Sequence, residues 1–231
     1  MARVSVAAAP GPDVGASWRD FGSLELSPIL DAALDVFREN GFHGGTVREI
    51  ARRVGMTVPA LYYHHENKEG LLVALLELGT GEVAWRVRAA ADEAAGRPEQ
   101  QFVNVIEAVV LHMAYRLRLA VLDTELRYLS PRNRRRYSAR RKAVENVLLD
   151  VIEAGVRDGV FTATDPAETS RALLGMCQSV GRWYSPGGRV SPEELAARYV
   201  DIARMAVGAL ARATLTEQSL AGGTSCRASS R

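Results

Sequence analysis

The side chains best suited to chemistry in this sequence lie between residues 46 and 68. Hydroxyl, phenol, imidazole and ammonium groups gather there, and such groups hydrogen-bond phosphates and base edges in DNA. Val58 and Pro59 add apolar surface that can touch thymine methyl groups. The candidate DNA-binding residues are Thr46, Thr57, Val58, Tyr62, Tyr63, His64 and Lys68.

Two short helices must position these residues. Thr46 and Glu49 form a capping box that starts the first helix, and Gly55 ends it. Thr57 caps the second helix, which we expect to run to about residue 65 with Leu61 facing the core. This pattern predicts a helix-turn-helix, whose second helix enters the major groove. An ordinary helical hairpin with exposed tyrosines of no function is the alternative.

The same stretch carries a family resemblance. Residues 46–72 read TVREIARRVGMTVPALYYHHENKEGLL, and ALDVFRENGF stands at 33–42. The pattern resembles the N-terminal domain of TetR-type transcriptional regulators and is collinear with it over about residues 27–75. The resemblance implies an all-helical homodimer, usually a repressor. Such a dimer binds a palindromic operator and lets go when a small molecule fills a C-terminal pocket.

The sequence departs from the family pattern in two places. Val58 and Pro59 stand where the family often has a polar pair such as Lys-Gly, so we expect more apolar base readout there. His65 replaces a frequent aromatic residue, and packing within the domain is the alternative to a DNA contact at that position. The matching positions imply DNA contacts by Thr46, Thr57, Tyr62, Tyr63, His64 and Lys68.

Helical periodicity continues along the rest of the chain. The expected fold is all-α, with an N-terminal three-helix helix-turn-helix domain and a C-terminal helical ligand-binding and dimerisation domain. Amphipathic patterns predict long helices over 101–121, 132–157, 166–184 and 192–212. The expected division is a flexible arm over 1–26, a DNA-binding domain over 27–72, an effector-binding and dimerisation domain over 73–213, and a disordered tail over 214–231.

A run of positive charge stands in the rear half. Arginine forks suit phosphate oxygens, so this run could form a pocket rim that holds the phosphates of coenzyme A. A solvated helix face in an arginine-rich chain is a second interpretation, and non-specific DNA contact is a third. With no acid from 127 to 142, we expect eight uncompensated charges: Arg127, Arg132, Arg134, Arg135, Arg136, Arg140, Arg141 and Lys142.

The rear half is also loosely similar to the C-terminal domains of family members that respond to acyl-CoA thioesters. This similarity makes an acyl-CoA one candidate for the small hydrophobic effector. A drug- or secondary-metabolite-responsive efflux regulator of the same fold is the alternative, and a helical acyl-CoA-binding enzyme or scaffold represents a different class. The candidate effector-binding residues are Trp85, Met113, Tyr128, Arg134, Arg135, Arg141, Met176 and Trp183.

The last two predicted helices contain residues suited to close packing. By the family resemblance, these helices pair with their copies as a four-helix dimer interface, and the two-fold symmetry matches a palindromic site. The packing residues are Gly175, Ser179, Gly181, Leu195, Tyr199, Ile202, Ala203, Ala206 and Leu210.

Composition narrows the remaining function classes. Of 231 residues 47% are hydrophobic and 24% charged, with a net charge of +2, which indicates a globular chain rather than a polybasic coat protein. No histidine or cysteine has metal-ligand spacing and no catalytic constellation stands out, so we expect no metal, no cofactor and no enzymatic activity. Two distant cysteines and the lack of a long apolar run favour the cytoplasm and no membrane partner.

The predicted DNA-binding domain is not itself basic. Residues 27–70 contain five basic and six acidic side chains, for a net charge of −1. Its affinity for DNA must therefore come from a few placed contacts, helix N-termini and dimerisation rather than from bulk charge.

Overall fold

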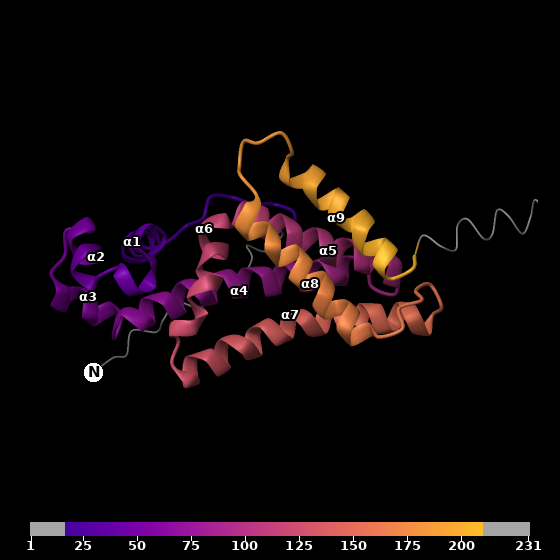
Figure 1. Cartoon of the computed structure of the whole chain (residues 1–231), viewed down its shortest axis with the longest axis horizontal. Helices are drawn as coiled ribbons and strands as arrows, with labels where there is room; N and C mark the ends of the chain where they lie inside the picture. The colour runs from indigo at the N-terminus through magenta and orange to yellow at the C-terminus, as the bar shows by residue number, and fades with distance from the viewer. Residues whose placement is uncertain (1–16, 210–231) are drawn as a thin grey trace, which may run out of the picture.

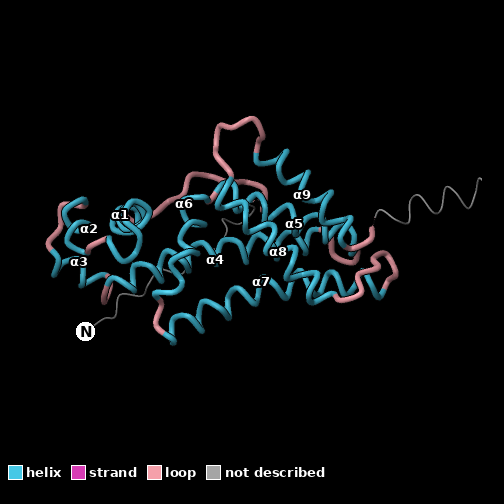
Figure 2. Tube along the Cα trace, viewed as in Figure 1, coloured by secondary structure: helices cyan, strands magenta, loops and turns pink. Residues whose placement is uncertain are grey.

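The computed structural model describes residues 17–209, in which all regular structure is helical and no strand occurs (Figure 2). The expected all-α fold is confirmed. The elements are α1 Pro28–Gly44, α2 Val47–Arg53, α3 Val58–His64, α4 Lys68–Glu93, α5 Pro98–Tyr115, α6 Leu117–Ala120, the 3₁₀ helix η1 Val121–Tyr128, α7 Pro131–Arg157, α8 Pro166–Trp183 and α9 Pro192–Ala206.

Side-chain caps fix where most of these helices begin. Thr46 Oγ1 accepts a hydrogen bond from Glu49 N at 3.1 Å, and Thr57 Oγ1 accepts one from Ala60 N at 3.3 Å. The starts expected for the two helices of the helix-turn-helix are confirmed. The same cap begins α1, α4, α7, α8 and α9 at Ser27, Asn67, Ser130, Asp165 and Ser191.

The single helix expected over 101–121 is wrong. Instead, α5 ends at Tyr115, α6 makes one short turn, and the chain continues as η1. The backbone leaves the helical region at Arg116, with φ −112° and ψ 33°, and the buried Arg116 guanidinium donates to Glu82 Oε2 at 2.8 Å. This partner lies on another helix, so helical periodicity does not reveal the break.

Two hydrophobic cores lie along the molecule, and α4 runs through both (Figure 1). At one end, α1–α3 pack on the first half of α4 around Phe37, Ile50 and Leu61. The second half of α4 joins α5, α7, α8 and α9 in a larger core that includes Phe102 and Leu148. The boundary expected after residue 72 falls within α4, so one continuous helix serves both units.

The turn from α6 through η1 attaches the rear helices to α1. Arg118 Nη2 donates to Asp31 Oδ1 and Asp35 Oδ1, each at 2.8 Å. At the end of η1, the Tyr128 ring stacks on Phe42 with ring centres 5.5 Å apart. The front unit therefore contacts the rear unit through η1 as well as through α4.

Residues 17–26, which we call the strap, pack first on the rear helices and then on the front core. The Trp18 side chain belongs to the rear core and is 3% exposed. The Phe21 ring stacks on Tyr115 with ring centres 4.7 Å apart. The expectation of a flexible arm over 1–26 is wrong for this segment, because one of its aromatic rings is buried and the other half-buried against helices that are distant in sequence.

Two buried arginines explain why the strap binds. Glu82 pairs with Arg86 at 2.7 Å and with Arg116 at 2.8 Å, which leaves one excess positive charge and unused N–H donors in an apolar region. The strap supplies acceptors for these donors. Arg86 Nη1 donates to Trp18 O at 2.7 Å, and Arg116 Nη1 donates to Gly22 O at 3.1 Å.

Several expectations concern the cysteines and the chain ends. Cys226 and the tail over 214–231 lie outside the described residues, as do residues 1–16. Cys177 is buried in the rear core, where burial raises the pKa of its thiol to about 12. Between residues 17 and 209, no helix is long and apolar enough to cross a membrane, and no three His, Cys, Asp or Glu side chains group as metal ligands.

We expect Trp18→Ala to destabilise the folded protein by about 3 kcal/mol or more, because it empties a buried aromatic position. Thermal unfolding followed by circular dichroism should show a melting temperature lower by on the order of 10 °C. Arg19→Ala is the control, because the ion pairs of Arg19 with Glu93 and Glu107 are partly exposed and such pairs contribute about 0–1 kcal/mol. Equal melting temperatures for the two variants would show that the strap is not bound.

Candidate DNA-binding surface and effector cavity

α2 and α3 form a helix-turn-helix. Gly55 has φ +66°, a left-handed conformation that glycine adopts without steric cost, and it ends α2. Ile50, Ala51 and Leu61 are buried where the two helices cross, and the small Ala51 allows a close approach. With Leu61 turned inward, the opposite face of α3 is left to solvent.

That outer face of α3 presents two phenols. Tyr63 is 75% exposed and Tyr62 is 44% exposed, and neither hydroxyl has a hydrogen-bond partner within the described chain. The His64 ring lies edge-on to Tyr63 with ring centres 5.6 Å apart. Thr46 and Thr57 are exposed at the starts of α2 and α3. This surface offers donors and acceptors to phosphates and base edges.

Two of the candidate DNA-binding residues face partly inward. The sequence predicts an outward Val58, but its side chain packs against the front core. Lys68 Nζ donates to Gly45 O at 2.7 Å and to His43 O at 3.3 Å, and it lies 4.6 Å from the centre of the Phe42 ring. Burial lowers the pKa of Lys68. The lysine thus fixes the turn before α2, and its third N–H remains for a phosphate.

Glutamates neutralise two of the three arginines of α2. Arg53 pairs with Glu39 at 2.5 Å and with Glu49 at 3.0 Å, and Arg52 pairs with Glu49 at 2.7 Å. Hydrogen bonds from Arg52 and Arg53 lower the pKa of Glu49 to about 2. Arg48 is exposed and has no ion pair among the described residues. It adds a cation to this surface that the sequence pattern did not single out.

His65, just after α3, is half-buried. Burial lowers the pKa of its imidazole, and the neighbouring His64 lowers it further. The side chain is therefore partly packed within the domain, as the alternative drawn from the sequence describes.

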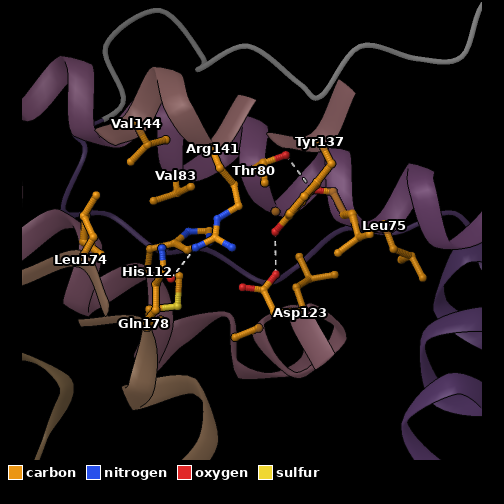
Figure 3. A pocket seen from close by; sticks show the side chains of 16 residues that line it. Leu75, Thr80, Val83, His112, Asp123, Tyr137, Arg141, Val144, Leu174 and Gln178 are labelled. Atoms are coloured by element: carbon orange, nitrogen blue, oxygen red, sulfur yellow. Dashed lines mark hydrogen bonds between the residues drawn. The ribbon is translucent and has the colours of Figure 1, made fainter. Parts of the chain in front are cut away.

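The rear unit contains an apolar cavity of about 60 Å³ between α4, α5, α7 and α8, with α6 and η1 also contributing to its wall (Figure 3). A cavity of about 150 Å³ holds benzene, so this one accepts only a short group in the conformation seen here. Most of the wall is aliphatic. The polar and charged side chains that line it are Thr80, His112, Asp123, Tyr137, Arg141 and Gln178.

Two hydrogen bonds cross this cavity wall (Figure 3). Tyr137 OH donates to Asp123 Oδ1 at 2.6 Å and so joins α7 to η1. Burial, together with the nearby Asp123, raises the pKa of Tyr137. Arg141 Nη2 donates to Gln178 Oε1 at 2.6 Å and joins α7 to α8.

His112 brings an unpaired polar atom to the same wall. The residue is 4% exposed, and its Nδ1 atom is buried with no hydrogen-bond partner within the described chain. Burial lowers the pKa of His112 to about 4; Glu82 raises it, while Arg86 and Arg116 lower it. The imidazole is therefore neutral at pH 7. An unpaired buried polar group costs about 1–3 kcal/mol, and a ligand that pairs it recovers part of that cost.

A surface cleft adjoins the cavity at the start of α7. Tyr137 and Arg141 line both spaces, and we call this pair the neck. The part of the cleft next to the neck has a volume of about 260 Å³ and is lined by Leu126, Arg127, Arg134, Tyr137, Ser138 and Arg141. A further part of about 500 Å³ is lined by Leu129, Pro131, Arg134, Arg135 and Ser138.

Ion pairs divide the run of positive charge. Arg136 and Arg140 both pair with Glu77, at 2.7 and 3.5 Å, and Lys142 pairs with Glu145 at 2.7 Å. The expectation of eight uncompensated charges is therefore wrong for these three, because their partners lie outside the run. No carboxylate among residues 17–209 pairs with the other five, which are Arg127, Arg132, Arg134, Arg135 and Arg141.

The structure does not bring all the candidate effector residues together. Four lie on the cavity or the cleft: Met113, Arg134, Arg135 and Arg141. Two are packed against the rear core, one stacks on the front unit and one is 54% exposed: Trp85, Met176, Tyr128 and Trp183. Sequence reasoning missed His112 as a lining residue, although it interrupts an apolar run in α5, because only packing shows which face of that helix meets a cavity.

Comparison with known proteins agrees with this architecture. The model for bacterial regulatory proteins of the tetR family matches residues 29–75, and the model for a tetracyclin repressor-like C-terminal domain matches residues 95–207. The crystal structure of a bacterial regulatory protein in the tetR family from Rhodococcus RHA1 is 30% identical, with a TM-score of 0.72, covering 78% of this chain and 95% of that one.

Two further proteins are similar along most of their length. The HTH-type transcriptional repressor KstR2 of Rhodococcus jostii (strain RHA1) is 29% identical over 180 residues, which are 75% of this chain and 86% of that protein. AibR, in a crystal structure with isovaleryl coenzyme A and operator DNA, has the same fold. It is 24% identical with a TM-score of 0.69, covering 75% of this chain and 95% of that one.

A helix-turn-helix carried at one end of a helical body defines a DNA-binding transcriptional regulator. The chain belongs to the TetR family. Regulators of this family bind operator DNA and small-molecule effectors, act as dimers and are not in general enzymes.

We expect Tyr63→Ala to abolish operator binding while leaving the oligomeric state unchanged. Loss of a base or phosphate contact costs about 1–3 kcal/mol per copy, so a dimer should lose roughly 100-fold or more in affinity. Gel shifts on DNA upstream of its own gene, or on sites selected from random duplexes, measure the effect. Tyr63→Phe is the matched control for the phenol hydroxyl. Full binding by the alanine variant would contradict the role assigned to α3.

Proposed function

We propose that this chain is a dimeric repressor, active in the cytoplasm, which leaves a palindromic operator when an acyl-CoA thioester binds. The observation that carries the proposal is that a small apolar cavity and an arginine-lined cleft lie on either side of the neck and share its two residues as lining. An acyl group suits the cavity, and the phosphates of coenzyme A require cations outside it. The relation to AibR, which binds isovaleryl coenzyme A, supports the same ligand class.

The cleft provides donors where the phosphates would lie. Arg134 Nη2 donates to Arg127 O at 2.8 Å, which holds the guanidinium at the cleft wall and leaves its other N–H groups free for a ligand. Arg135 lines the outer part of the same cleft. Planar guanidinium groups of this kind bind phosphate oxygens bidentately.

η1 is the element through which ligand binding would reach the DNA-binding unit. Tyr137 in the neck holds Asp123 of η1. Two residues later, Glu125 Oε2 accepts a hydrogen bond from Phe42 N at 3.3 Å, and Tyr128 stacks on the same Phe42. An eight-residue 3₁₀ helix is unusually long, and such stretches often mark hinges. A ligand that displaces Tyr137 would therefore shift η1 and, with it, the end of α1.

α8 and α9 offer an apolar surface for a second copy of the chain. Trp183, Ile202 and Met205 are 54%, 44% and 60% exposed. An added Cβ at Gly175 would meet no atom within 4 Å, so a partner helix can approach α8 closely there. These residues belong to the two helices that the family resemblance assigns to the dimer interface.

Other residues suggested for that packing lie within the protomer. Leu195 and Ala203 are buried in the rear core, and Leu210 lies outside the described residues. An added Cβ at Gly181 would lie 2.7 Å from Ala120 Cβ, so this glycine serves the contact between α8 and α6. The interface proposed here therefore uses only the outer faces of α8 and α9.

We expect a short-chain acyl-CoA to release the protein from its operator in a gel shift, while the free acid and coenzyme A alone act weakly. The double variant Arg134→Gln, Arg135→Gln should need about 10-fold more acyl-CoA for release, because it lacks two phosphate contacts. Its DNA affinity without ligand should equal that of the wild type.

Arg132→Gln is the matched control, because Arg132 belongs to the same run and is exposed but lines neither part of the cleft. Equal release of the double variant and this control would show that the run is only a solvated face. If a drug-like compound releases the protein from its operator and no acyl-CoA does, the proposed ligand class is wrong and the effector is a drug-like molecule.

We expect Tyr137→Phe to weaken operator binding in the absence of ligand by about 10-fold. Loss of the Tyr137 hydroxyl leaves the Asp123 carboxylate without its phenol donor, and η1 is then held less firmly in the conformation proposed to bind DNA. Acyl-CoA affinity, measured by calorimetry, should remain within a few-fold. Tyr184→Phe is the control: its hydroxyl donates to Val190 O at 2.9 Å, at the end of α8. Wild-type operator affinity in Tyr137→Phe would contradict the role of η1.

A further inference from the structure

We propose that the acyl group of the effector carries a second oxygen, in a keto, hydroxyl or carboxylate group, and that His112 and Gln178 bind this oxygen inside the cavity. The inference rests on the acyl-CoA effector proposed above. It concerns only the part of the ligand that enters the cavity and is tested independently of the cleft.

The polar residues of the cavity differ in whether they also line the cleft. Arg141 lines both the cleft and the cavity, so the thioester carbonyl, which joins coenzyme A to the acyl group, would lie beside its guanidinium. His112 and Gln178 line the cavity alone. In the proposed pose these two residues face the acyl chain rather than the coenzyme A moiety.

Both of these residues have unmatched hydrogen-bonding atoms. His112 Nδ1 is buried without a partner among the described residues. Gln178 Oε1 accepts from Arg141, whereas the Gln178 amide nitrogen has no acceptor within residues 17–209. The two side chains come from α5 and α8, and both line the cavity (Figure 3). A plain alkyl group would exclude water and leave both atoms unpaired.

The chemistry of these atoms selects an oxygen. A neutral imidazole has one donor nitrogen and one acceptor nitrogen. If Nδ1 carries the proton, His112 and Gln178 both donate to a carbonyl or carboxylate oxygen. If Nδ1 lacks the proton, a hydroxyl donates to it and accepts from the Gln178 amide. An ammonium group is disfavoured, because Arg141 is nearby and the one carboxylate lining the cavity, Asp123, already accepts from Tyr137.

Thr80 lines the same cavity but does not share this role. Its hydroxyl donates to Leu76 O at 2.7 Å within α4, so its hydrogen-bonding need is met without a ligand. The selectivity for an oxygenated acyl group is thus assigned to His112 and Gln178, and Thr80 supplies a matched control.

The test compares butanoyl-CoA with 3-oxobutanoyl-CoA, 3-hydroxybutanoyl-CoA and succinyl-CoA by isothermal calorimetry on the full chain. We expect at least one of the three oxygenated compounds to bind about 10-fold or more tightly than butanoyl-CoA, because a site with buried donors rejects a ligand that cannot pair them. His112→Leu should reduce this preference to about threefold or less without weakening butanoyl-CoA, whereas Thr80→Val should retain the full preference.

Each other outcome has a defined meaning. Equal affinities of the wild type for all four thioesters would overturn this inference and leave the acyl-CoA effector standing. A preference that survives in both His112→Leu and Gln178→Leu would also overturn it. Failure of every acyl-CoA to bind or to release the operator would instead overturn the proposed function. If His112→Leu melts at a lower temperature than the wild type, the ligand preference is measured in Gln178→Leu instead, because Gln178 is only half-buried and its replacement disturbs the core less.

Discussion

One buried cluster of charge determines much of this structure. Glu82 lies between Arg86 and Arg116, and the two arginines need more acceptors than one carboxylate supplies. The backbone of the strap provides them, which ties the segment before α1 to the rear core. Arg116, which pairs with Glu82, is also the residue at which α5 ends and the chain turns into α6 and η1. Those two elements then contribute to the wall of the cavity.

The cluster also sets the electrostatics of the cavity. His112 stands near Glu82, Arg86 and Arg116, and its burial keeps the imidazole neutral, so it offers hydrogen bonds rather than charge. The permanent positive charge in the wall comes from Arg141, at the neck. A cation at the neck and the neutral side chains of His112 and Gln178 within the cavity suit an amphipathic anion whose apolar end lies in the cavity.

Two of the contacts that join the units, through α4 and through η1, offer a direct route for the proposed coupling between them. α4 is a single helix that packs in both cores, and η1 bonds to the neck at one end and to Phe42 at the other. Lys68 reaches from the first turn of α4 to the loop just before α2. In the proposed function, a ligand at the neck would act through these contacts on the turn that orients the helix-turn-helix.

The front unit can be predicted from the sequence, because caps, a glycine turn and an inward Leu61 are local features within about twenty residues of each other. The arginine run is visible in the sequence as well. Which of those arginines remain unpaired depends on the packing of the helices, because Glu77 and Glu145 lie outside the run. The binding of the strap, the break after Tyr115 and the placement of His112 and Gln178 on one cavity likewise depend on partners far apart in sequence. Periodicity reports which face of a helix is apolar, and packing decides what that face meets.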